Sequence, residues 1–114
     1  MITTKVSGAQ RRNLHIDFEM YTDGDAEFKG ELIVLMIDNL TELQGIVRSA
    51  AKNNDPKIFH GVCHKVKPTI EMLADPDLSQ TLVELKVNLA DASKVDFLEG
   101  VCTEIIESLR QEMA

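Results

Sequence analysis

The sequence has few of the features that mark extracellular, membrane or nucleic-acid-binding proteins. Only two of its 114 residues are cysteines, Cys63 and Cys102, which is too few for a disulfide framework and predicts reduced, buried thiols. No apolar run approaches the ~20 residues that span a bilayer, and the first residues lack the apolar centre of a secretory signal. The net charge of −7 argues against a nucleic acid or an anionic membrane as partner. These absences predict a cytoplasmic protein.

Strand-like alternation is missing and glycine-rich turns are few, so the pattern of apolar residues favours helices. Four long segments with short connections predict an all-α fold, an antiparallel up-and-down four-helix bundle with a short extra N-terminal helix within residues 13–21. One bundle domain is expected at residues 13–114, after a flexible tail at 1–12. The predicted core positions are Phe28, Leu32, Leu35, Met36, Leu40, Leu43, Ile46, Val47, Phe59, Val62, Cys63, Val66, Ile70, Leu73, Leu78, Leu82, Leu85, Leu89, Phe97, Leu98, Val101, Cys102, Ile105, Leu109 and Met113.

Aspartate and proline mark the expected helix starts. The Asp-Pro pairs at 55–56 and 75–76 place a capping side chain directly before proline at the first helical position. Asp23 or Asp25 is expected to cap the long helix that precedes them. The sequence SKVD at 93–96 predicts a capping box for the last helix, with aspartate in place of the usual glutamate or glutamine.

The segment KIFHGVCHKVKP at residues 57–68 departs from the acidic character of the chain. It contains three lysines, and no aspartate or glutamate occurs from residue 56 to 70. On a helix with about 100° per residue, His64 lies opposite the apolar side and faces solvent. Gly61, one turn earlier, leaves a bare spot beside it, although a larger residue would favour the helix by up to ~1 kcal/mol. This combination suits the approach of an anionic or acidic group to His64.

The segment also allows two other interpretations, a metal site and an ordinary surface histidine. His60 and His64 are spaced i, i+4, which can hold a metal ion, but Cys63 points about 100° away towards the core. Two histidines alone make a weak metal site, and Lys57 and Lys67 would repel a cation. The second alternative is that His64 is an ordinary surface histidine.

Pro68 lies inside the helical pattern. The apolar stripe keeps its phase from Val66 to Ile70, which predicts that the helix continues and bends at the proline. The alternative is a separate helix that begins at Pro68.

The sequence CHKVKPTIEML resembles the phosphoacceptor segment of histidine-containing phosphotransfer (HPt) domains of bacterial two-component phosphorelays. These domains carry a histidine, a lysine three residues later and then a small residue, on the second long helix of a four-helix bundle. His64 and Lys67 match this pattern, whereas Pro68 stands where glycine is common. The sequence DGDAEFKGELIVLMIDN at 23–39 is similar to the start of the preceding helix in that family. The resemblance covers roughly residues 14–113.

This resemblance implies a phosphorelay carrier. His64 would accept a phosphoryl group and pass it to or from an aspartate of a receiver domain. Lys67 would stabilise the phosphate. Supporting roles fall to Lys65, His60, Gly61 and Pro68.

The chemistry of phosphoryl transfer agrees with this interpretation. Transfer needs an in-line nucleophile and charge stabilisation, and a neutral imidazole, with an unperturbed pKa of about 6.5, is a competent nucleophile near pH 7. The sequence has no glycine-rich phosphate loop and no acidic pair placed for magnesium, so ATP-dependent kinase activity and a bound cofactor are not expected. Mg²⁺ is expected from the partner, the receiver domain of a response regulator or hybrid histidine kinase. We expect the protein to be a monomer. The alternative to a phosphorelay carrier is a helical interaction module that docks a receiver or other acidic domain without carrying phosphate.

Overall fold

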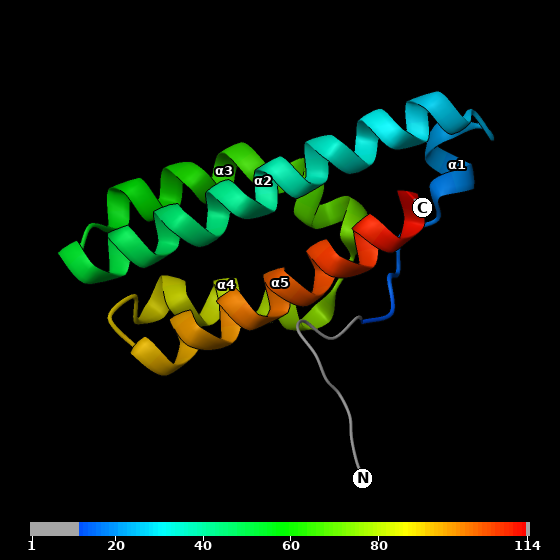
Figure 1. The fold of residues 1–114 in the computed structure, drawn as a ribbon. Helices are drawn as coiled ribbons and strands as arrows, with labels where there is room; N and C mark the ends of the chain where they lie inside the picture. The colour runs from blue at the N-terminus through cyan, green and yellow to red at the C-terminus, as the bar shows by residue number, and fades with distance from the viewer. Residues whose placement is uncertain (1–11, 114) are drawn as a thin grey trace, which may run out of the picture.

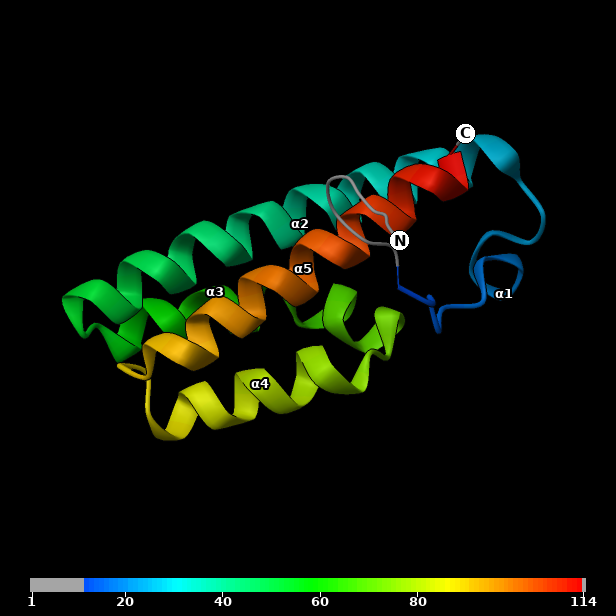
Figure 2. The same cartoon turned by 60° about the horizontal axis from the view of Figure 1, so that its bottom comes forward.

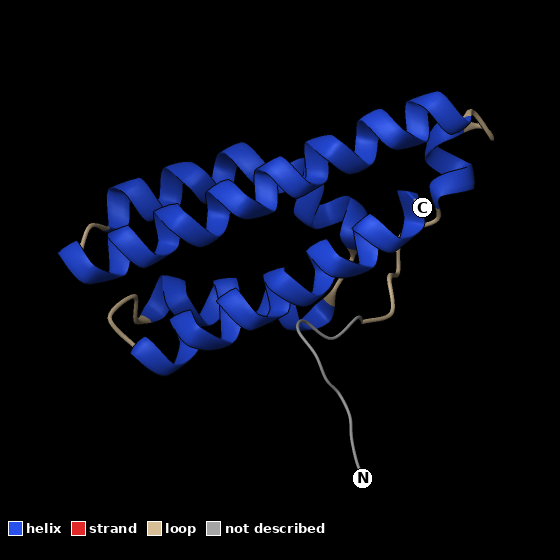
Figure 3. Cartoon of the chain, in the orientation of Figure 1, coloured by secondary structure: helices blue, strands red, loops and turns tan. Residues whose placement is uncertain are grey.

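The computed structural model describes residues 12–113, which form helices and the loops that join them (Figures 1 and 3). The helices are α1 (Phe18–Thr22), α2 (Ala26–Asn53), α3 (Pro56–Leu73), α4 (Pro76–Val87) and α5 (Ala92–Met113). No strand occurs between residues 12 and 113, so the prediction of an all-helical chain is confirmed for this part. The predicted tail, apart from its last residue, lies outside the described residues.

Aspartate side chains begin three of the long helices at the predicted places. The carboxylates of Asp25, Asp55 and Asp75 each accept a hydrogen bond from the backbone N–H three residues later, over 3.0, 3.2 and 3.1 Å. Each bond satisfies one of the N–H groups that the first turn of a helix leaves without a partner. The other candidate cap, Asp23, instead ends α1 with a left-handed backbone (φ 53°).

The start of α5 differs from the predicted capping box. The helix begins at Ala92, and the carboxylate of Asp91 accepts bonds from the N–H groups of Ser93 and Lys94 over 3.1 and 3.3 Å. The Ser93 hydroxyl also donates to this carboxylate over 2.6 Å. Aspartate and serine are both favoured caps, so the local sequence does not decide whether the helix begins after Asp91 or after Ser93.

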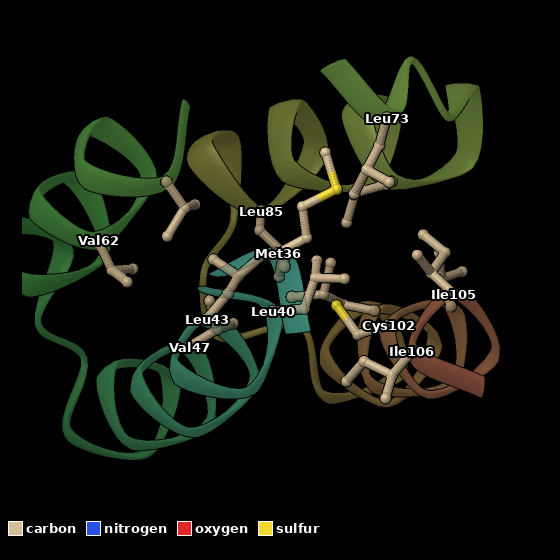
Figure 4. Close-up of a cluster of buried hydrophobic side chains, with 14 of the residues drawn as sticks. Met36, Leu40, Leu43, Val47, Val62, Leu73, Leu85, Cys102, Ile105 and Ile106 are labelled. Carbon is tan, nitrogen blue, oxygen red and sulfur yellow. The ribbon is translucent and has the colours of Figure 1, made fainter. Parts of the chain in front are cut away.

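The four long helices share one hydrophobic core. α2 packs against α3 and α5, α4 packs against the same two helices, and α1 contacts α2 (Figures 1 and 2). Figure 4 shows side chains from all four long helices converging, among them Met36, Val62, Leu85 and Ile105. Each helix buries one side, as the apolar stripes predict, and the result is a helical bundle. None of the helices within residues 12–113 has the length and apolarity needed to cross a membrane.

Four of the predicted core positions are exposed: Phe28, Leu35, Phe97 and Met113. Leu35 and Asn39 are one turn apart on α2, and Asn39 contacts Thr69 near the end of α3. α3 ends only four residues after Thr69, so α2 extends past it on this side. Leu35 is 51% exposed although it belongs to an apolar stripe, whereas Leu32 and Met36 of the same helix are buried.

Arg12, which the sequence placed in the flexible tail, is bound to the folded domain. Its guanidinium pairs with Asp75 and Glu104 over 3.1 and 2.8 Å, and also with Asp77. Its backbone N–H donates to the Ser108 hydroxyl over 2.7 Å, and that hydroxyl donates to the Arg12 carbonyl over 2.6 Å. Arg12, the last residue of the predicted tail, is therefore held by contacts with the start of α4 and with α5.

Candidate functional site

Local sequence and core packing together place His64 on the surface of α3. Asp55 and Pro56 begin the helix, and its buried side consists of Phe59, Val62, Val66, Thr69 and Leu73. His64 lies on the exposed side, as the helical spacing predicts.

His64 lines a groove between α3 and α4. The groove has a volume of about 310 Å³ and is lined by Phe59, His60, Cys63, His64, Lys67, Leu82, Val83 and Lys86. Its apolar residues come from both helices, and its polar residues are two histidines, two lysines and a thiol. The structure thus brings together three of the predicted site residues, His60, His64 and Lys67.

Lys86 is a groove residue that the sequence did not reveal. It comes from the last turn of α4, 22 positions after His64 in the chain (86 − 64). A lysine in a helical last turn has an ordinary role, because it interacts favourably with the helix dipole. Only the packing of α4 against α3 places this side chain beside the predicted phosphoacceptor.

The groove is basic in a chain that is acidic overall. None of its lining residues is a carboxylate. Lys67 lies 4.0 Å from Glu71, at the limit of an ion pair, and Lys86 forms no ion pair within residues 12–113. Both ammonium groups are therefore accessible to an anion that enters the groove.

Lys65 does not join this site. Its ammonium group pairs with Glu42 of α2 over 2.9 Å, on the side of α3 away from the groove. The supporting role of Lys65 stays a prediction, and in this structure its charge is matched by a carboxylate of α2. A helical wheel places Lys67 on the side of His64 and Lys65 on the other flank, and the neighbouring helices determine what each flank faces.

Gly61 and Pro68 lie on the exposed side of α3 and outside the groove lining. A Cβ atom built on Gly61 would meet no atom within 4 Å, so the bare spot that the sequence predicted is present. A larger side chain there would project into solvent without disturbing the core.

The helix runs through Pro68 without interruption. α3 extends from Pro56 to Leu73, so the alternative of a separate helix beginning at Pro68 is wrong. In Figures 1 and 2 the last turns of α3 leave the line of its first turns, as expected for a bend at proline. The next residue, Thr69, is buried and accepts a hydrogen bond from the Asn39 amide over 2.7 Å, which ties this part of α3 to α2.

Cys63 is half-buried at the groove, whereas Cys102 is buried in the core. Burial raises the pKa of the Cys63 thiol to about 11, and the nearby charge of Lys86 lowers it in part. Burial also raises the pKa of Cys102, to about 12. Both thiols are free, and neither is activated as a nucleophile.

Alkylation of Cys63 tests this environment. At pH 8 a thiol with a pKa near 11 has roughly one hundredth of the thiolate of an ordinary cysteine, so we expect iodoacetamide to modify Cys63 about 100-fold more slowly than free cysteine. Mass spectrometry of the native protein measures the rate. In concentrated guanidinium chloride both cysteines should react at the ordinary rate. Fast modification of native Cys63 would contradict its burial.

A larger depression of about 920 Å³ lies beside the segment before α1 and the end of α5. Its lining includes Arg12, Asp17 and Glu112 but no histidine, cysteine or lysine. It offers no nucleophile comparable to His64. Among residues 12–113, no three histidine, cysteine, aspartate or glutamate side chains gather closely enough to hold a metal ion.

Compared with protein-family models, curated proteins and solved structures, the chain matches none of them. The candidate site therefore rests on the chemistry of the groove around His64.

Proposed function

We propose that this chain is a cytoplasmic, monomeric phosphohistidine carrier of the HPt class, which accepts a phosphoryl group on His64 and exchanges it with an aspartate of a receiver domain. One observation carries the proposal: an exposed histidine lines a groove that also contains two lysines and no carboxylate. The packing of α2 and α4 against both α3 and α5 suits the antiparallel four-helix bundle that the resemblance implies.

In the proposed transfer, the unprotonated ring nitrogen of His64 forms a P–N bond while the P–O bond of the partner's aspartyl phosphate breaks. The aspartate carboxylate leaves with the electron pair, and the proton on the second ring nitrogen stays. Lys67, which lines the same groove one turn after His64, stabilises the charge on the phosphoryl oxygens. The receiver domain supplies Mg²⁺, and reversal of these steps returns the group to an aspartate.

Two phosphoryl donors test the proposal in separate ways. Phosphoramidate is small enough to reach His64 without docking, whereas a panel of phosphorylated receiver domains must dock before transfer. We expect both to produce one acid-labile phosphate, located on His64 by peptide mass spectrometry. Binding of a receiver without any labelling would favour an interaction module that carries no phosphate. A label on His15 or His60 would contradict the assigned phosphoacceptor.

Gly61→Arg is expected to separate docking from chemistry. The arginine would project into the open space beside His64 and obstruct a receiver domain, so transfer from the cognate receiver should fall at least about tenfold. Labelling by phosphoramidate and the urea unfolding midpoint should change little, because no packed atom is displaced. Gly45→Arg, at an exposed and equally open position on α2, serves as the matched control. Normal transfer by Gly61→Arg would place the docking surface elsewhere.

A further inference from the structure

We propose that Lys86 of α4 is a second cation for the phosphoryl group on His64, so that the phosphohistidine is held between α3 and α4. This inference rests on the proposed function and adds a residue outside the phosphoacceptor segment. His64 and Lys67 both belong to α3, whereas Lys86 reaches the groove from the neighbouring helix.

Three observations place the Lys86 charge at the site. Lys86 lines the same groove as His64 and Lys67. It acts electrostatically on the thiol of Cys63, the residue directly before His64. It has no carboxylate within 4.0 Å in residues 12–113, so its ammonium group does not have to leave an ion pair to bind phosphate.

The acidic residue nearest to Lys86 in the sequence does not neutralise it. Glu84, two positions earlier on α4, pairs with Lys94 over 2.8 Å and accepts a hydrogen bond from Gln80 over 3.2 Å. The Lys94 interaction is the main cause that lowers the pKa of Glu84. Glu84 is therefore already engaged by other side chains.

A phosphoryl group on His64 would place close to two negative charges at the rim of this groove. Lys67 alone provides one positive charge from α3. The positive charge of Lys86 balances the second negative charge of the phosphoryl group, and its charge-assisted hydrogen bonds to that group link α3 to α4. Phosphorylation should then stabilise the folded state, and the gain should depend on Lys86. An ordinary interaction of Lys86 with the α4 dipole would affect the phosphorylated and unphosphorylated forms equally.

The test compares urea unfolding midpoints of each protein with and without phosphorylation by phosphoramidate. Measurements at 10 °C and pH 8 preserve the acid-labile and heat-labile phosphohistidine. The midpoint difference between the two forms should fall by about 0.5 M in Lys86→Ala relative to wild type. Lys86→Arg should retain most of the difference, because the charge remains at the groove.

Lys57→Ala is the matched control. Lys57 is exposed on α3 and does not line the groove, so its removal should leave the midpoint difference at the wild-type value. If Lys86→Ala behaves like Lys57→Ala in a protein labelled on His64, the role of Lys86 is overturned and the carrier proposal stands. If wild type takes no phosphoryl group from phosphoramidate or from any receiver, the carrier proposal fails and this inference fails with it.

Discussion

His64→Gln is expected to abolish phosphoryl acceptance completely, from phosphoramidate and from receiver domains alike. Glutamine keeps a polar side chain on the exposed side of α3 but has no nucleophilic nitrogen, because its amide lone pair is delocalised. The fold should be retained, since His64 contributes nothing to the buried side of the helix. Circular dichroism and the urea midpoint check the fold, and intact-protein mass spectrometry checks for the added phosphoryl group.

His60→Gln is the matched control for this experiment. His60 lines the same groove one turn earlier, so a non-specific effect of removing a histidine would appear in both variants. We expect His60→Gln to keep more than half of the labelling, because it leaves His64 and both groove lysines in place. Loss of labelling only in His60→Gln would exchange the roles of the two histidines.

Arg12→Ala is expected to produce the largest loss of stability among surface-accessible positions, roughly 2 kcal/mol. Its partner Asp75 is 4% exposed and would be left without a cation, although it would keep its capping bond to Leu78. The estimate lies below the loss for fully buried pairs because the Arg12 side chain is 20% exposed. Urea unfolding, monitored by circular dichroism, measures the change.

Two variants show whether the Arg12 effect comes from the buried aspartate. Arg12→Lys retains the charge but cannot make the divergent bonds to Asp75 and Glu104, so it should recover only part of the stability. Arg48→Ala removes an arginine whose partners within residues 12–113 are the exposed Asp96 and the partly exposed Glu99, and it should cost much less. Equal losses from Arg12→Ala and Arg48→Ala would mean that the burial of Asp75 does not matter.

The helix starts at Asp55 and Asp75 could be predicted because their causes are local. An aspartate followed by proline satisfies a free N–H group and presets the backbone within a few residues. The start of α5 could not be placed in the same way. Asp91 and Ser93 are both competent caps, and the two choices differ by too little in local energy for the sequence to decide.

The candidate site likewise combines properties set by the local sequence with properties set by packing between helices. Helical periodicity by itself determined that His64 faces solvent, that Gly61 leaves open space and that the helix passes Pro68, because these properties depend on neighbours within two turns. Only the tertiary structure decided which charges are available: Lys65 is matched by Glu42, whereas Lys86 enters the groove. These pairings join different helices, and no local pattern encodes the distance between two helices. Side-chain exposure was therefore determined by the sequence where the helix alone sets it, and by packing where a second helix covers or reaches it.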